Sequence, residues 1–232
     1  SMPIGAYSEK HIMPENKLVP VPEGVSNEVA SCVTLKGITA EYLLHRAYPL
    51  KKGDKVLYHA AAGALGQILC PWANSIGAEI IGTVGSKEKE EIAKKNGCHH
   101  VINYTDKNFV EEVEKIVGKN GIDVVYDGVG LKTFEGSIEV LKIRGMMVAF
   151  GNASGYVDTI DVKKHINAKG LFFTRPSIAH YTIERDELLE AAKKVFDAVL
   201  SGKFKIDISK KYSLNEVKQA HQDLEGRLLT GP

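Results

Sequence analysis

The sequence predicts an α/β fold built on a doubly wound, mostly parallel (Rossmann) sheet. Val56, Leu57 and Tyr58 form a short apolar run, which is followed closely by small residues (HAAAGALG, 59–66) and then by a helical pattern. From there to residue 150, short apolar strands alternate with helices, which implies right-handed βαβ crossovers. A chain of 232 residues, 44% hydrophobic and 25% charged, is large enough for one substantial core.

The amino-terminal residues 1–36 stand outside this pattern. Four of the eight prolines fall in the first 22 residues, so we expect extended segments or short strands without a core of their own. A helix over residues 34–48 is predicted next, because apolar residues at helical spacing should face inward: Leu35, Ile38, Tyr42 and Leu43. Pro49 and Gly53 end it.

The strands of the sheet are predicted at residues 55–58, 79–84, 101–104, 123–126, 146–150 and 171–174. Helices are expected between them at residues 64–75, 87–95, 109–117 and 134–141, and Pro71 should kink or interrupt the first. A helix over 185–200, a strand over 204–208 and a last helix follow. Ser213 and Glu216 form a capping box that starts the last helix, whose expected apolar face is Leu214, Val217, Ala220 and Leu224.

Composition and charge exclude several classes of partner. The net charge of +1 and the scattered Lys and Arg argue against nucleic acid. Apolar runs are too short for a membrane helix, and the start lacks a signal sequence, so we expect a cytoplasmic protein. The three cysteines, Cys32, Cys70 and Cys98, are odd in number and lack the close pairs of zinc sites, so we expect reduced thiols. We expect no metal site, because His99 and His100 point to opposite faces of a strand.

The turn after the first strand is typical of phosphate binding. Backbone N–H groups and a helix N-terminus meet an anion there, and the G-x-G-x-x-G frame falls on Ala61, Gly63 and Gly66. Proteins that bind NAD carry an acid about 20 residues later, at the end of the second strand, but that region reads IIGTVGSKEK (80–89) and has no acid before Glu88. Ser86 is a good N-cap and Lys89 falls at N3, where a cation opposes the helix dipole unless an added phosphate is present. This favours NADPH, with a merely solvated charged helix as the alternative.

Three other places at the same edge of the sheet could contact a ligand. Tyr104 ends the third strand and is either an edge aromatic or a cofactor contact. The runs DGVG (127–130) and FGNASG (150–155) follow the fourth and fifth strands. Their glycines permit close approach to a ligand and equally permit a turn.

In this order, these pieces resemble the zinc-free quinone oxidoreductase (zeta-crystallin-like) branch of the medium-chain dehydrogenase/reductase superfamily. The stretches that carry the resemblance are GAYSEKHIMP (5–14), LKGITAEYLL (35–44), HAAAGALG (59–66), GTVGSKEK (82–89), VINY (101–104), VVYDGVG (124–130), FGNASG (150–155) and TRPS (174–177). The resemblance implies NADPH-dependent reduction of quinones or related electron-poor alkenes. It also implies a homodimer, formed through the edge of the Leu171–Thr174 strand.

The resemblance also implies roles for individual residues. Thr39 would approach the nicotinamide side, and Gly63, Ala64 and Leu65 would hold the pyrophosphate. The 2′-phosphate would lie among Ser86, Lys89, Tyr104 and Arg227, although Arg227 is equally a plain helix-end cation. The nicotinamide arm would be lined by Phe150, Gly151 and Ser154, and Gly82 and Val129 complete the expected cofactor-binding set. No catalytic acid or base is legible.

The family's pattern is incomplete in this chain. Members are longer at the amino end, where a GroES-like catalytic domain supplies much of the substrate pocket. We therefore expect remnants of that domain at residues 1–36, an NADPH-binding domain at 37–178 and a carboxyl-terminal return at 179–232. The expected function is that of a truncated NADPH-dependent quinone oxidoreductase. The alternatives are an NADPH-binding module without turnover and an enoyl or alkenal reductase. A methyltransferase-type domain would need an acid near Thr83, which is absent.

Overall fold

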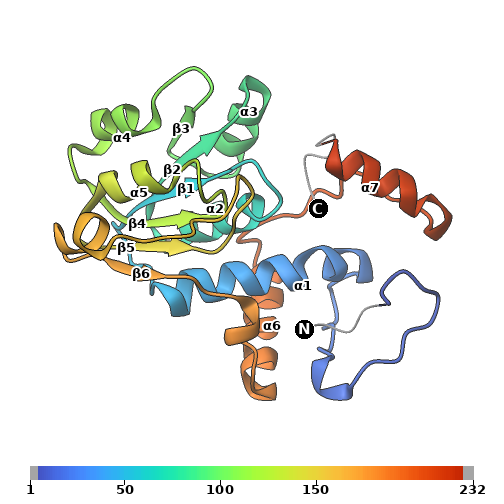
Figure 1. The fold of residues 1–232 in the computed structure, drawn as a ribbon. Helices are drawn as coiled ribbons and strands as arrows, with labels where there is room; N and C mark the ends of the chain where they lie inside the picture. Colours follow the sequence, from blue (N-terminus) through green and yellow to red (C-terminus); the bar gives the residue numbers. More distant parts are fainter. Residues whose placement is uncertain (1–4, 227–232) are drawn as a thin grey trace.

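The computed structural model describes residues 5–226 and contains one six-stranded sheet in the order β3-β2-β1-β4-β5-β6. All its neighbouring strands run parallel. The strands are β1 (Lys55–His59), β2 (Glu79–Val84), β3 (His100–Asn103), β4 (Ile122–Asp127), β5 (Leu141–Ala149) and β6 (Phe172–Thr174). The order reverses between β1 and β4, which is where such sheets bind ligands. The predicted fold class is confirmed (Figure 1).

Helices cover both faces of the sheet, and each face has its own core. Successive strand residues point to opposite faces, so Val56 and Tyr58 pack in one core while Leu57 packs in the other. The first core joins α1 (Asn27–Tyr42), α2 (Gly66–Ile76), α3 (Lys87–Lys95) and α6 (Arg185–Leu200). The second joins α4 (Phe109–Val117) and α5 (Phe134–Val140). None of the described helices has the length and apolar character that a membrane crossing needs.

Helices α1 and α6 pack closely against each other. A Cβ added at Gly37 of α1 would stand 2.5 Å from Cγ1 of Val195 on α6. Only glycine allows this approach, so Gly37 sets the distance between the two helices. Short helical turns complete the fold at Glu15–Lys17, Leu43–Ala47, Val162–Asn167, Ile178–His180 and Leu214–Glu216.

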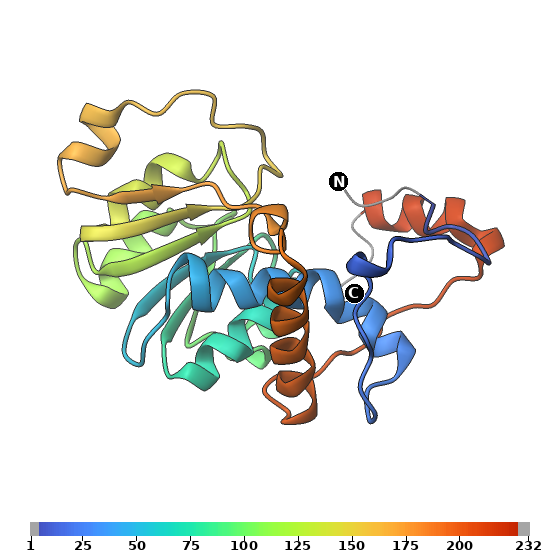
Figure 2. The ribbon, with the colours of Figure 1, turned by 90° about the horizontal axis from the view of Figure 1, so that it is seen from below.

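The amino-terminal segment and the last helix lie together, to one side of the sheet (Figure 2). The rings of Tyr7 and His221, on α7 (Val217–Glu225), meet edge to face at 5.5 Å. Asp223 is the buried residue of α7, and its carboxylate accepts hydrogen bonds from Lys210 (2.7 Å) and Tyr212 (2.5 Å). These bonds, led by the one from Lys210, lower the pKa of Asp223 to about 2.

The first helix differs from its prediction. It begins at Asn27 rather than Thr34, because the Ser26 hydroxyl accepts a hydrogen bond from the Val29 N–H (3.2 Å) and caps it. The proposed boundary between residues 36 and 37 therefore falls inside a helix. Leu35 was expected to face inward, but its side chain is 51% exposed. Residues 5–26 contain one short helical turn and no strand.

Two predictions about later elements were also wrong, and a third was wrong in part. Residues 204–208 form no strand: Phe204 is buried beside Trp72, but the segment has no partner strand to bond with. The capping box at Ser213 and Glu216 is present, yet the expected apolar face of α7 is not buried, and Leu224 is 62% exposed. Pro71 does not interrupt α2, which runs as one helix from Gly66 to Ile76, so of the two predicted effects only a kink remains.

Candidate functional site

The turn between β1 and α2 is held in one conformation by backbone contacts. Ala60 adopts a left-handed conformation (φ 62°), and the Ala61 N–H donates to the Thr83 carbonyl on β2 (3.0 Å). A Cβ at Gly66 would stand 2.3 Å from the Ala61 carbonyl oxygen, so only glycine fits where the helix begins. The N–H groups of Ala64 and Leu65 meet no acceptor within residues 5–226. Unpaired donors at a helix N-terminus are suited to bind an anion.

The end of β2 supports this turn and starts α3. A Cβ at Gly82 would lie 2.6 Å from the Ala61 Cβ and 2.8 Å from the Cys98 Sγ, so Gly82 lets the turn pack onto the strand. Ser86 is the N-cap residue of α3, and Lys89 is its third residue, as predicted. The Ser86 hydroxyl does not cap the helix backbone. Instead it helps to lower the pKa of the Glu88 carboxyl, second to a bond from that residue's own backbone.

A pocket of about 230 Å³, the Lys89 pocket, joins the turn to the start of α3. It brings together four residues predicted to bind a cofactor. Its lining comprises Ala60, Ala62, Gly63, Ala64, Val84, Gly85, Lys89, Ile92, Tyr104 and Leu224. Tyr104 follows β3 directly and is 49% exposed. A Cβ at Gly85 would stand 2.5 Å from the Tyr104 hydroxyl oxygen, so the phenol lies over the glycine.

The predicted residues Gly82, Leu65 and Ser86 do not line the Lys89 pocket. Gly82 is buried beneath the turn, and Leu65 packs against the first core. Arg227 lies outside the described residues.

The loops after β4 and β5 are bonded to each other. The Ser154 hydroxyl donates to the Val129 carbonyl (2.8 Å) and accepts from the Lys132 N–H (3.0 Å). A Cβ at Gly151 would stand 2.4 Å from the Gly128 carbonyl oxygen. The structure thus brings the predicted residues Val129, Gly151 and Ser154 together, but it shows the Ser154 hydroxyl engaged within the loops.

A buried carboxylate organises the first of these loops. Asp127 is fully buried, and its Oδ1 accepts from the N–H groups of Val129 (2.7 Å) and Gly130 (3.0 Å). Its Oδ2 accepts from the Thr133 hydroxyl (2.7 Å), just before α5. A buried charge is tolerated when all its oxygens are hydrogen-bonded in this way. The loop at the carboxyl edge of β4 is therefore fixed before any ligand arrives.

A buried histidine lies beside this loop, and the sequence reading missed it. His59 Nδ1 is 2.9 Å from the Thr83 hydroxyl, and Nε2 is 2.9 Å from the Ser137 hydroxyl. Because the Ser137 hydroxyl donates to the Thr133 carbonyl (2.7 Å), it must accept from His59 Nε2–H. Burial lowers the pKa of His59, and this outweighs the opposite effect of Asp127. The neutral imidazole therefore ties β1 to β2 and α5.

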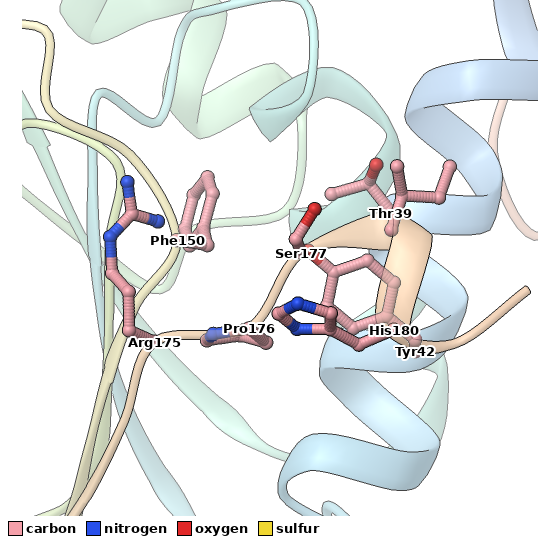
Figure 3. Close-up of a pocket in the computed structure, with 8 residues that line it drawn as sticks. Thr39, Tyr42, Phe150, Arg175, Pro176, Ser177 and His180 are labelled. Carbon is pink, nitrogen blue, oxygen red and sulfur yellow. The ribbon is translucent and has the colours of Figure 1, made fainter. Parts of the chain in front are cut away.

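A second pocket, the Arg175 pocket, opens where α1 meets the chain leaving β6 (Figure 3). It has a volume of about 480 Å³ and brings the predicted residues Thr39 and Phe150 together. Its lining comprises Thr39, Tyr42, Phe150, Arg175, Pro176, Ser177, Ile178 and His180. Arg175 donates from Nη1 to the Ala149 carbonyl (3.0 Å) at the end of β5. Sequence reasoning treated Tyr42 as core and gave Arg175 and His180 no role, although TRPS after the sixth strand was a usable signal.

Residues that surround the Arg175 pocket fix the position of its Tyr42 ring. The Tyr42 ring stacks on Tyr181 at 4.5 Å, and burial, followed by the proximity of Tyr181, raises the pKa of Tyr42 to about 12. Arg46 donates to the Tyr181 carbonyl (2.9 Å) and pairs with the buried Glu41 (2.9 Å). Lys194 of α6 also contacts the Glu41 carboxylate (3.3 Å). The Tyr42 hydroxyl thus keeps its proton at neutral pH.

Known proteins match this chain over nearly its whole length. The family model described as zinc-binding dehydrogenase matches residues 64–200. A 2-haloacrylate reductase from Burkholderia is 44% identical over 232 residues, covering 99% of this chain and 70% of its own length. Quinone oxidoreductase 1 of Escherichia coli is 42% identical over 231 residues, which cover 98% of this chain and 70% of that protein.

A solved structure agrees with these matches. The crystal structure of Escherichia coli quinone oxidoreductase complexed with NADPH superposes with a TM-score of 0.93 at 41% identity, covering 99% of this chain and 71% of that one. The chain belongs to the quinone oxidoreductase branch of the medium-chain dehydrogenase/reductase superfamily. The predicted resemblance is confirmed.

The zinc in the description of the matched family model has no site in the described part of this quinone oxidoreductase homologue. No group of three or more His, Cys, Asp or Glu side chains within residues 5–226 is placed to hold a metal ion. The unpaired N–H groups of Ala64 and Leu65, with Lys89 at the adjoining pocket, do fit the phosphates of a dinucleotide.

Proposed function

We propose that this chain binds NADPH and directs its hydride to a quinone or a related electron-poor alkene. One observation carries the proposal: Lys89 lines the same pocket as the phosphate turn and Tyr104. A lysine in the first turn of a helix opposes the helix dipole, whereas a bound phosphate makes it favourable. NADPH carries such a phosphate on its adenosine ribose and NADH does not.

The proposed cofactor contacts keep the residues that the resemblance implies. The two pockets support them in part, since one is lined by Gly63, Ala64, Lys89 and Tyr104 and the other by Thr39 and Phe150. The pyrophosphate is proposed to lie at Gly63, Ala64 and Leu65, with Gly82 shaping the turn beneath it. The 2′-phosphate is assigned to Lys89, Ser86 and Tyr104, with Arg227 from the undescribed end. The nicotinamide arm is assigned to Thr39, Val129, Phe150, Gly151 and Ser154. Both pockets lie at the carboxyl edge of the sheet, so one extended dinucleotide can reach from one to the other.

The chain's own residues would position the reactants. NADPH supplies the hydride when it is bound, and binding beside the acceptor removes the entropic cost of their encounter. The neutral Tyr42 hydroxyl and the remaining Arg175 donors can hydrogen-bond an acceptor oxygen in the Arg175 pocket. Phe150 shields the same space from water. Hydride transfer would leave an oxyanion on the acceptor, which these hydrogen-bond donors would stabilise until it takes a proton from water.

The test measures NADPH oxidation with 1,4-benzoquinone and, separately, the Kd values of NADPH and NADH. We expect quinone-dependent turnover, and Lys89→Gln should raise the Kd for NADPH about tenfold, which corresponds to about 1.4 kcal/mol. The Kd for NADH should stay unchanged. Lys94→Gln is the matched control, because Lys94 is on the same helix and pairs with Glu91 (2.8 Å). Binding without turnover would support an NADPH-binding module instead, and equal effects of both variants would refute the role of Lys89.

A second candidate activity is the reduction of an acrylate. The Arg175 guanidinium lies in the Arg175 pocket, where it can pair with a substrate carboxylate. A relative that is 44% identical to this chain is a 2-haloacrylate reductase. If 2-chloroacrylate is a substrate, Arg175→Gln should reduce its turnover more than that of its methyl ester. Enoyl and alkenal reduction, the other alternative within the superfamily, would show no such preference for the acid.

We also propose that two copies pair through β6. This edge strand bonds to β5 on one side, and Phe172 is 57% exposed. Open edges are commonly covered by pairing. Sedimentation should show a dimer, and Phe172→Lys should shift it toward monomer; a monomeric wild type would refute the pairing. A cytoplasmic location is proposed with it, since Cys32, Cys70 and Cys98 are free thiols.

A further inference from the structure

A third pocket lies next to the Arg175 pocket and has no role in the function proposed so far. This Leu35 pocket has a volume of about 710 Å³, within the range of small-molecule sites. Its walls come from three separate parts of the chain: the amino-terminal segment, α1, and the segment from Ser177 into the first turn of α6. Its main apolar lining residues are Met13, Val19, Leu35, Ile38, Ile183 and Leu188.

The two pockets share a wall. Ser177 and Ile178 line both the Arg175 pocket and the Leu35 pocket. A molecule held beside Tyr42 and Arg175 therefore needs to extend only past these two residues to enter the Leu35 pocket. Helix α1 also contributes to both, through Thr39 on one side and Leu35 on the other.

The chemistry of the two pockets differs. The Arg175 pocket offers a guanidinium, an imidazole and hydroxyl groups, whereas the Leu35 pocket is lined mainly by aliphatic side chains, with Lys17 as its charged lining residue. Leu35 is 51% exposed and Ile183 is 66% exposed, so large apolar side chains meet solvent there. Burying such surface against an apolar ligand is favourable.

We propose that the Leu35 pocket binds the apolar tail of the acceptor, so that the preferred substrates are quinones bearing an alkyl or prenyl chain. The quinone ring lies in the polar Arg175 pocket, and its tail passes Ser177 and Ile178 into the apolar one. This rests on the proposed quinone reductase function and specifies its substrate class. It predicts selectivity for amphipathic acceptors over small, tail-free ones.

The test is a series of 2-alkyl-1,4-benzoquinones that share one ring and differ only in chain length. We expect kcat/KM to rise with each methylene until the pocket is full. The upper limit is about fourfold per methylene, equivalent to about 0.8 kcal/mol for complete burial. A kcat/KM that does not change with chain length in the wild type would overturn the proposal.

A matched pair of variants separates pocket binding from general hydrophobicity. Leu35→Gln puts an amide into the pocket and should flatten the dependence on chain length. Leu200→Gln is the control, because Leu200 has the same exposed fraction, 51%, also lies on a helix, and does not line the pocket. Equal flattening in both variants would refute the pocket. So would a change in oligomeric mass in Leu35→Gln without a change in chain-length dependence, because the pocket would then be an interface.

Binding measurements keep this proposal distinct from the proposed function. Titration of 2-alkylhydroquinones into the NADP-bound protein, followed by calorimetry, reports tail binding without turnover. If affinity rises with chain length while no quinone is reduced, the tail pocket stands and the reductase function fails. If quinones are reduced but neither affinity nor kcat/KM depends on the tail, the function stands and the tail pocket fails.

Discussion

The Gly66→Ala substitution tests whether the phosphate turn depends on a contact that only glycine allows. The new Cβ would stand 2.3 Å from the Ala61 carbonyl oxygen and 2.7 Å from its carbon. Ordinary contacts between such atoms lie at about 3.5–4.0 Å, so the turn and α2 must separate by about 1 Å. Because the two opposing atoms of Ala61 belong to the backbone, no side chain can rotate away to relieve the contact. Overpacking of this kind costs about 1–3 kcal/mol.

Two measurements follow from this displacement. Urea unfolding should show a free energy of unfolding lowered by about 1–3 kcal/mol, and titration should show NADPH affinity reduced at least tenfold. Gly63→Ala is the comparison: its Cβ would stand 3.1 Å from the Ala60 carbonyl oxygen, a milder contact at the rim of the Lys89 pocket. It should weaken NADPH binding while costing less than about 1 kcal/mol of stability. A Gly66→Ala protein with wild-type stability and NADPH affinity would refute this reasoning.

Three further predictions concern buried polar groups. The pKa of His59 is lowered from 6.5 in the fold, so wild-type stability should fall as pH drops below 6.5, by up to about 1.4 kcal/mol per pH unit; equal pH dependence in His59→Gln would contradict this. Asp127→Asn replaces one of the two oxygens that accept from Val129, Gly130 and Thr133 with an amide that donates, and should lower the free energy of urea unfolding by about 1.5–3 kcal/mol; an unchanged value would exclude the carboxylate as the organiser of the loop. The pKa of Asp223 is lowered to about 2, so its carboxylate stabilises α7 above the unfolded value of 3.8 and loses this effect toward pH 2. Asp223→Asn should therefore speed hydrogen exchange in α7 but not in α6 at neutral pH; equal exchange in both proteins would contradict the role of this carboxylate.

Local patterns predicted the nucleotide-binding half well. The strands were predicted to within one residue at each end, except that β5 begins at Leu141 rather than Met146, and the start of α3 is marked by Ser86 after a strand. Lys89 could be placed at the third helical position from those signals alone. The added part of β5 was missed because Lys142, Ile143 and Arg144 are exposed and form no apolar run. The position of His59 could have been inferred, because β1 and β2 pair in parallel from Lys55 and Glu79 onward, which places His59 beside Thr83.

The sequence reading failed where burial depends on distant segments. Leu35 and Leu224 have helical spacing typical of a core, yet they are 51% and 62% exposed, because each lines an open pocket instead of packing in the core. Residues 204–208 have an apolar pattern compatible with a strand, but a strand needs a hydrogen-bonding partner that a local pattern does not supply. The Arg175 pocket combines Thr39, Phe150 and Arg175 from three distant positions, so only the fold brings them together.

The most direct test of the central claim is the ratio of the Kd values of NADH and NADPH for the wild-type protein. The two cofactors differ only in the 2′-phosphate, which we assign to the Lys89 pocket. Charged hydrogen bonds contribute about 1.5–3 kcal/mol, so NADPH should bind at least about tenfold more tightly. NADH binding as tightly as NADPH, or more tightly, would contradict the account.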